Sequence, residues 1–116
     1  MPWVVLEHPS FARERREFPR DVSDKLDEAI LALSVAGPRL GRPLVDTLKG
    51  SRHANMKELR FSEAKGVWRF AFAFDHNRDA VILVGAEKQG VSQHRFYKTF
   101  IRVADQRFEE WLEAIG

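Results

Sequence analysis

Residues 67–75 read Val-Trp-Arg-Phe-Ala-Phe-Ala-Phe-Asp, and the alternation in this stretch decides how the chain folds. Aromatic residues occupy every second position, and small or polar residues stand between them. Successive side chains of a β-strand point to opposite faces of a sheet, so the stretch is predicted to be a strand with one buried aromatic face. Its other face carries Arg69, Ala71 and Ala73. Such a face suggests the open floor of a groove in which Arg69 stands, and an ordinary half-exposed strand with a surface arginine is the alternative.

Three further strands are predicted around this one. Residues 3–7 and 56–61 have strand composition or alternation, and the almost continuously apolar residues 80–86 are typical of a strand that is covered on both sides. Residues 63–66 are expected to form the turn into the aromatic strand, so that Arg60 and Arg69 share one face of a pair of strands. By the same alternation Lys57 lies on the aromatic side, and residues 39–55 are expected to be rich in loops.

Three helices complete the pattern. A short helix is expected after Ser10, a candidate N-cap, and a second helix over residues 22–36 stops at Gly37 and the proline behind it. A long final helix begins after Ser92, with one apolar stripe at 3- and 4-residue spacing. The predicted fold class is therefore α+β, with an N-terminal helical pair and a C-terminal helix packed on a mainly antiparallel sheet of about four strands.

Length and composition limit the possible classes of protein. With 116 residues and 44% hydrophobic content, residues 1–116 are expected to form a single domain. The chain has no cysteine, which excludes disulfides, thiol nucleophiles and cysteine-based metal sites. No segment resembles a signal peptide or reaches a membrane-spanning length, so we expect a soluble cytoplasmic protein without a membrane partner.

The small net charge of +2 hides an uneven distribution. Residues 1–38 carry 5 Lys/Arg against 7 Asp/Glu, residues 39–69 carry 8 against 3, and residues 70–116 carry 6 against 7. The basic residues of the middle third alternate with apolar ones, which is typical of a folded cationic surface that binds a polyanion such as nucleic acid. A solvated basic face without a specific partner is the alternative.

The side chains available for chemistry are mainly cationic. The four histidines are scattered without metal-ligand spacing, and phosphate-binding glycine loops and nucleophile elbows are absent from the sequence, so neither a metal nor a cofactor is predicted. A group of cations with a phenol and two imidazoles can bind a phosphate and assist metal-free RNA cleavage, in which the ribose 2′-OH attacks its own 3′-phosphate. The members of this group are Lys57, Arg60, Arg69, Lys88, Tyr97, His53 and His94.

Together these segments resemble the RelE/ParE superfamily of bacterial toxins, and most closely its phage-derived, HigB-like branch. The resemblance covers nearly the whole chain, and its most specific parts are Lys57-Glu58-Leu59-Arg60, the strand that contains Arg69, Lys88 at a strand end, and Tyr97-Lys98. It implies the toxin of a type II toxin–antitoxin pair, whose partners are a cognate antitoxin of the helix-turn-helix kind and mRNA on the ribosome. RelE-like members cut mRNA in the ribosomal A site without metal, whereas ParE-like members poison DNA gyrase.

The resemblance also implies roles for individual residues. Arg69 matches the arginine that stabilises the scissile phosphate, whereas Glu58 stands where RelE-like toxins place a lysine for proton transfer, and Gln89 replaces the second basic residue after Lys88. The implied catalytic set is Arg69, Arg60, Lys88, Tyr97 and His53, and the implied RNA-binding set is Arg52, Lys57, Lys65, His94 and Lys98. The expected function is a ribosome-dependent, metal-free mRNA endoribonuclease that arrests translation. A ParE-like gyrase inhibitor and a non-catalytic binding module are the alternatives.

Overall fold

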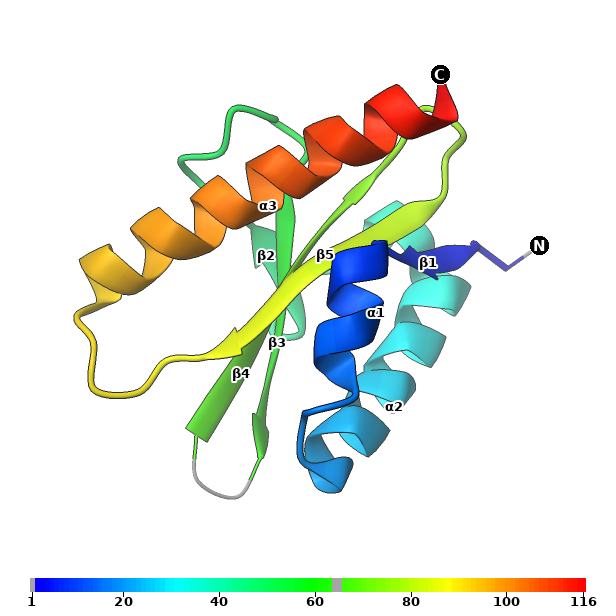
Figure 1. Cartoon of the computed structure of the whole chain (residues 1–116). Coiled ribbons are helices and arrows are strands. Elements are labelled where there is room, and N and C mark those ends of the chain that lie inside the picture. Colours follow the sequence, from blue (N-terminus) through cyan, green and yellow to red (C-terminus); the bar gives the residue numbers. More distant parts are fainter. Residues whose placement is uncertain (1, 64–65) are drawn as a thin grey trace.

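A computed structural model describes residues 2–63 and 66–116, which contain five strands, three α-helices and a short 3-10 helix (Figure 1). The strands are β1 (Val5–Glu7), β2 (Val45–Thr47), β3 (Lys57–Glu63), β4 (Gly66–Phe74) and β5 (Ala80–Glu87). The helices are α1 (Pro9–Arg15), α2 (Arg20–Ala36), η1 (Gly37–Arg39) and α3 (Gln93–Ile115). The predicted α+β class, with two helices before the main strands and one after them, is confirmed.

The strands form one sheet in the order β1-β5-β4-β3-β2. All neighbouring pairs are antiparallel except β1 and β5, which run parallel, so the expectation of a mainly antiparallel sheet is confirmed. The sheet has five strands instead of about four, because β2 lies inside the segment that was expected to be loop. Its buried Val45 pairs with Leu59 of β3. Three residues are too few to show a strand period in the sequence.

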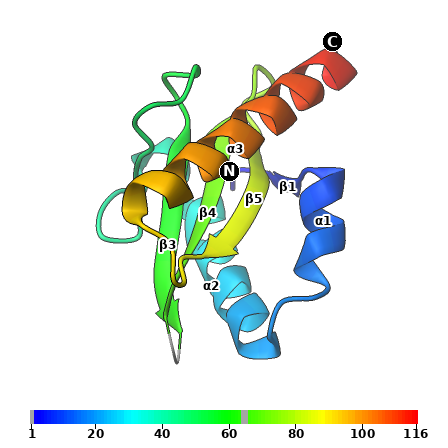
Figure 2. The same ribbon diagram turned by 60° about the vertical axis from the view of Figure 1, so that its left-hand side comes forward.

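The aromatic face of β4 is buried, as predicted. Phe70 and Phe72 pack in a core with Phe11 of α1 and with Leu26 and Leu33 of α2. Figures 1 and 2 show α1 and α2 together on this side of the sheet. This layer buries two phenylalanines and the apolar stripe of α2, and removal of this apolar surface from water stabilises the fold.

The opposite face of β4 is not the open floor that the sequence suggested. Ala71 and Ala73 are fully buried, because α3 crosses this face and packs Phe100, Ala104 and Phe108 on it (Figure 2). The small alanines allow the helix to approach the sheet closely, and the apolar stripe of α3 needs such a surface to leave water. At one end of this face, Arg69 lines a hollow.

Two helix ends lie where the sequence predicted them, and one N-cap differs from the prediction. Gly37 terminates α2 with φ of +59°, and a Cβ there would lie 2.3 Å from Nε1 of Trp3. Ser92 caps α3, since its hydroxyl accepts a hydrogen bond from the Arg95 N–H at 3.2 Å. Ser10 is not the N-cap of α1: His8 is, and its Nδ1 accepts from the Ser10 N–H at 3.0 Å. The turn expected over residues 63–66 includes Ala64 and Lys65, which lie outside the described residues.

Candidate functional site

Three side chains from three different elements are linked in a row at one end of the sheet. Nε of Arg69 on β4 donates a hydrogen bond to the hydroxyl of Tyr97 on α3 at 2.8 Å, and that hydroxyl donates to Oε2 of Glu58 on β3 at 2.6 Å. Nε of Arg69 lies 3.9 Å from the same oxygen, and the side chains of Arg69 and Glu58 are only 12% and 7% exposed. The Arg69–Tyr97–Glu58 row is therefore a largely buried ion pair bridged by a phenol.

Strand register and the cap of α3 place these groups together. Arg60 stands directly opposite Arg69 in the β3–β4 ladder, and Glu58 stands opposite Ala71, the next pair on the same face. The expectation that Arg60 and Arg69 share a face is thus confirmed. Because Ser92 fixes where α3 begins, Tyr97 falls in the helix's second turn, within reach of β3.

The guanidinium of Arg69 is only partly used by the protein. Its Cζ lies 5.5 Å from the ring centroid of Phe96 and 5.7 Å from that of Tyr97, so two aromatic rings hold it in place. Within the part of the chain that the structure describes, Nε is its only nitrogen with a hydrogen-bond partner. The two terminal NH₂ groups therefore remain available as donors to an anion.

Two hollows border the Arg69–Tyr97–Glu58 row. Arg60 and Arg69 line one of about 390 Å³. Glu58 and Tyr97 line the other, of about 930 Å³, whose further ionisable lining residues are Asp46, Lys49, His94 and Lys98. An arginine pair thus faces one hollow, while a carboxylate and a phenol face the other.

The environment of Tyr97 raises the pKa of its hydroxyl above the usual value. The main cause is burial, and the hydrogen bond to the Glu58 carboxylate adds to it, whereas the positive charge of Arg69 acts in the opposite direction. The phenol therefore keeps its proton at neutral pH and stays the donor in its contact with Glu58.

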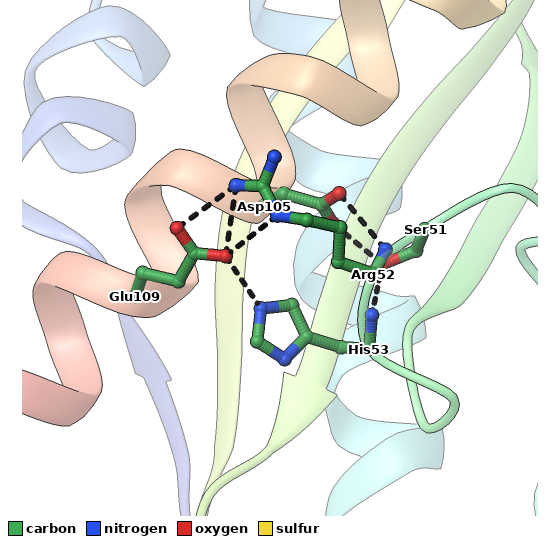
Figure 3. A network of polar contacts seen from close by, with 5 residues as sticks. All are labelled: Ser51, Arg52, His53, Asp105 and Glu109. Carbon is green, nitrogen blue, oxygen red and sulfur yellow. Dashed lines mark hydrogen bonds and ion pairs between the residues drawn. The ribbon is translucent and has the colours of Figure 1, made fainter.

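A second polar network joins the loop before β3 to the far half of α3 (Figure 3). Asp105 accepts hydrogen bonds from the Ser51 hydroxyl and from the Arg52 N–H, the latter at 3.0 Å. Glu109 accepts from Nε and Nη2 of Arg52 at 3.0 and 2.8 Å, and its Oε2 lies 3.1 Å from Nε2 of His53. We call these five residues the clasp, because they hold the loop on the helix.

The clasp lies away from the Arg69–Tyr97–Glu58 row. Glu109 follows Tyr97 by 12 residues, which is about 18 Å along an α-helix. Hydrogen bonds to Glu109 raise the pKa of Arg52, and the Glu109 carboxylate also contacts the His53 ring. The structure therefore does not bring Arg52 and His53 to Arg69, although the sequence placed both in the candidate site.

A family model of phage-derived Gp49-like proteins (DUF891) matches residues 13–109 of the chain. The chain belongs to this Gp49-like family. It is 45% identical over 109 residues to a Mycobacterium tuberculosis protein named as a candidate toxin, HigB3, and the match covers 94% of the chain and 93% of that relative. It is 44% identical over 94 residues to the candidate toxin HigB2 of the same organism, covering 80% of the chain and 46% of that protein.

A solved structure shares the fold of this Gp49-like chain. It is that of the Escherichia coli toxin RelE, an arginine-to-alanine double mutant in the free state, with a TM-score of 0.58 and 11% sequence identity. The match covers 88% of the chain and 96% of the RelE chain. With the family match, this confirms the resemblance to the RelE/ParE superfamily and its phage-derived, HigB-like branch.

The other predicted site residues of the Gp49-like chain divide between several places. His94 and Lys98 line the larger hollow. Lys88 directly follows β5, in which Ala86 pairs with Arg69. Lys57 pairs with Phe72 and so belongs to the aromatic side, as its alternation predicted, where it lines a different hollow. Lys65 lies outside the described residues.

Two contributors to the site were not recognised from the sequence. Glu58 was treated as a departure from the family pattern, yet it accepts the hydrogen bond that anchors Tyr97. Phe96 was assigned to the helix core, yet its ring lies against the Arg69 guanidinium. A signal for Glu58 did exist: it is an acidic residue in alternation with Arg60, on the face that the sequence assigned to Arg69.

Over residues 2–63 and 66–116, no three or more His, Cys, Asp or Glu side chains gather in an arrangement that could hold a metal ion. None of the helices in those ranges combines the length and apolar character needed to cross a membrane.

Proposed function

We propose that this chain is the toxin of a type II toxin–antitoxin pair, and that it arrests translation by cutting mRNA on the ribosome. The relatives named as HigB toxins support the toxin class, and the RelE fold is compatible with it. The same relatives imply a cognate antitoxin as a partner, for which a helix-turn-helix protein is our expectation. A ribosomal target also implies that the protein acts in the cytoplasm.

One observation carries the nuclease proposal: the terminal NH₂ groups of Arg69 are uncommitted and lie beside a hollow that Arg60 also lines. A guanidinium with two free parallel donors matches a phosphodiester group, and charge-assisted hydrogen bonds of this kind are the strong ones. Because Phe96 and Tyr97 already hold Arg69 in place, little side-chain freedom is lost when a phosphate binds.

The larger hollow suits the RNA on either side of that phosphate. Its volume of about 930 Å³ is enough for a nucleotide, since small-molecule sites commonly measure roughly 300–1,000 Å³. Lys49, His94 and Lys98 at its walls can contact the sugar–phosphate backbone. Lys88 extends the cationic surface from the end of β5.

In the proposed reaction the ribose 2′-oxygen attacks the adjacent phosphorus atom and the 5′-oxygen leaves. Negative charge builds up on the phosphate oxygens in the transition state, where Arg69 and Arg60 stabilise it. The ribosome aligns the mRNA in the site, so that binding supplies much of the orientation that the reaction needs.

The test is expression of the protein without its antitoxin, combined with measurement of amino-acid incorporation and mapping of new RNA 5′ ends. We expect loss of translation and mRNA cuts that appear only on ribosome-bound messages. Arg69→Ala should abolish these effects, and Arg102→Ala, which removes an exposed arginine from the outer side of α3, should not. Normal translation with DNA breaks would favour gyrase as the target, and absence of any growth effect would favour a binding module.

A further inference from the structure

Glu58 is an acidic residue within an otherwise cationic site. Its carboxylate is buried against the protein, yet it lines the larger hollow. The contacts that the structure gives it, from the Tyr97 hydroxyl and from Arg69, both involve Oε2. Among the described residues nothing donates a hydrogen bond to Oε1. One carboxylate oxygen is thus held by the protein, and the other is available to a ligand in the hollow.

The direction of the hydrogen bond between Tyr97 and Glu58 decides which group can accept a proton. Tyr97 keeps its proton, because burial and the neighbouring carboxylate raise the pKa of the phenol. A phenol that donates to Oε2 restricts the rotation of the carboxylate. The same hydroxyl accepts a hydrogen bond from Nε of Arg69 at 2.8 Å. Tyr97 is therefore a positioning residue, and Glu58 is the acceptor at the end of the row.

Two other predicted site residues that could accept a proton are occupied or lie on another face. His53 is bound in the clasp by Glu109, and Lys57 belongs to the aromatic side of the sheet. In contrast, Oε2 of Glu58 lies 3.9 Å from Nε of Arg69. A phosphate held by the terminal NH₂ groups of Arg69 would bring its own ribose to the neighbourhood of Glu58, because the 2′-hydroxyl is adjacent to the 3′-phosphate in RNA.

We propose that Glu58 is the proton acceptor of the RNA cleavage, an inference that rests on the proposed function. The Glu58 carboxylate takes the proton of the 2′-hydroxyl while the 2′-oxygen forms a bond to phosphorus. The bond from phosphorus to the 5′-oxygen breaks, and that oxygen takes a proton from a water molecule. The hydroxide left behind removes the proton from Glu58, which restores the carboxylate and leaves a 2′,3′-cyclic phosphate and a 5′-hydroxyl.

The experiment measures single-turnover cleavage of mRNA on programmed ribosomes, as a function of pH, for the parent and four variants. General-base catalysis contributes roughly 10²–10⁴ in rate, so Glu58→Gln should cleave more slowly by about that factor. The cleavage rate of the parent should fall at acidic pH, and that of Glu58→Gln should not. Tyr97→Phe keeps the carboxylate, so its cleavage rate should be about tenfold lower and should still fall at acidic pH. Glu63→Gln, which changes a carboxylate at the other end of β3 that pairs with Lys25, should cleave like the parent.

Other titratable groups face Glu58 and need a control. Arg69 and Tyr97 contact it, and Asp46, Lys49, His94 and Lys98 line the same hollow. The imidazole of His94 lines this hollow and can also act as a general base, so the fourth variant is His94→Gln. If Glu58 is the acceptor, the cleavage rate of His94→Gln should still fall at acidic pH. If the rate stops falling at acidic pH in His94→Gln but not in Glu58→Gln, the assignment is overturned.

A second measurement covers the possibility that a Glu58 variant folds poorly. Glu58→Ala leaves space for a small carboxylate, and added formate should restore a measurable part of its cleavage rate while chloride at equal ionic strength should not. If the parent cleaves mRNA and Glu58→Gln cleaves it equally fast with the same pH dependence, this inference alone is overturned. Parent protein that leaves ribosome-bound mRNA intact overturns the proposed function and the inference with it.

Discussion

Two arginine networks connect the β3 region to α3, and they use their arginines differently. In the clasp, both Nε and Nη2 of Arg52 bind the Glu109 carboxylate, and the Arg52 side chain is 64% exposed. In the Arg69–Tyr97–Glu58 row, Arg69 uses only Nε in hydrogen bonds to the residues that the structure describes, and its side chain is 12% exposed. An arginine whose Nε and Nη2 both bind one carboxylate attaches one segment to another, whereas a positioned arginine whose two terminal NH₂ groups are free can bind an anion.

The two networks should also differ in what they contribute to stability. An exposed pair such as Arg52–Glu109 contributes little to stability, because water and salt screen its charges. The Arg69–Tyr97–Glu58 row requires two charges to leave water, a cost that a buried ion pair often fails to recover. The row is therefore better explained by a role in binding or catalysis than by stability.

The largest expected difference is in cleavage. Arg69→Ala should lower the single-turnover rate on programmed ribosomes by about 10²–10³, because a donor aimed at developing charge is lost. Arg52→Ala should cleave almost as fast as the parent. Thermal melts are the control, since Arg69→Ala also leaves Glu58 buried without its cation, at a cost of about 1–3 kcal/mol. Equal losses of cleavage in the two variants would remove the functional distinction between the networks.

The next effect concerns the buried half of the clasp. Asp105 is 3% exposed and accepts from the Ser51 hydroxyl and the Arg52 N–H. Asp105→Ala should lower the free energy of unfolding by about 1–3 kcal/mol, because two partly buried donors lose their acceptor. Denaturant unfolding measures this loss, and Glu109→Ala is the exposed control, for which a smaller loss is expected. A larger effect at Glu109 than at Asp105 would contradict the assignment of the clasp's stability to its buried part.

A third prediction uses the fact that Tyr97 is the only tyrosine in the chain. The tyrosinate absorbance should appear only above the ordinary pKa of about 10, since burial and Glu58 raise the pKa of this phenol. Because the unfolded phenol ionises first, the stability linked to Tyr97 is complete below pH of about 10 and is lost as pH rises toward the folded pKa. The stability difference between parent and Tyr97→Phe should therefore shrink at alkaline pH. Titration at or below the ordinary pKa would show that Tyr97 does not donate to Glu58.

The smallest effect is expected at the exposed end of the clasp. The hydrogen bond from Arg52, and next that from His53, lower the pKa of Glu109. A carboxylate with a lowered folded pKa stabilises the fold above its unfolded pKa, and this stabilisation is lost as pH falls through the folded value. Melting temperatures of parent and Glu109→Gln should therefore converge at acidic pH, and also in high salt, which screens exposed pairs. A difference that grows on acidification would show that another group controls this region.

The features that the sequence predicted are those set by neighbours along the chain. The alternation of residues 67–75 identified the buried aromatic face, and the same period put Arg60 beside Arg69 and turned Lys57 to the other side. Gly37 and Ser92 marked helix ends because their preferences are local. The strand β2 was missed because three residues carry no period, and the cap of α1 was missed because histidine is not among the usual N-cap residues.

Only the tertiary structure decided which surfaces and side chains meet. The sequence showed the apolar stripe of α3 but not where it packs, and its packing over Ala71 and Ala73 closes the face that was expected to be open. The same packing brings Tyr97 to Glu58, and it brings the far half of α3 to the loop that holds His53. Glu58 lies in β3 and His53 stands only five residues before it, yet Glu58 enters the site and His53 the clasp. The physical reason is that periodicity fixes which face of an element a residue is on, whereas contacts between distant elements depend on how their surfaces fit together.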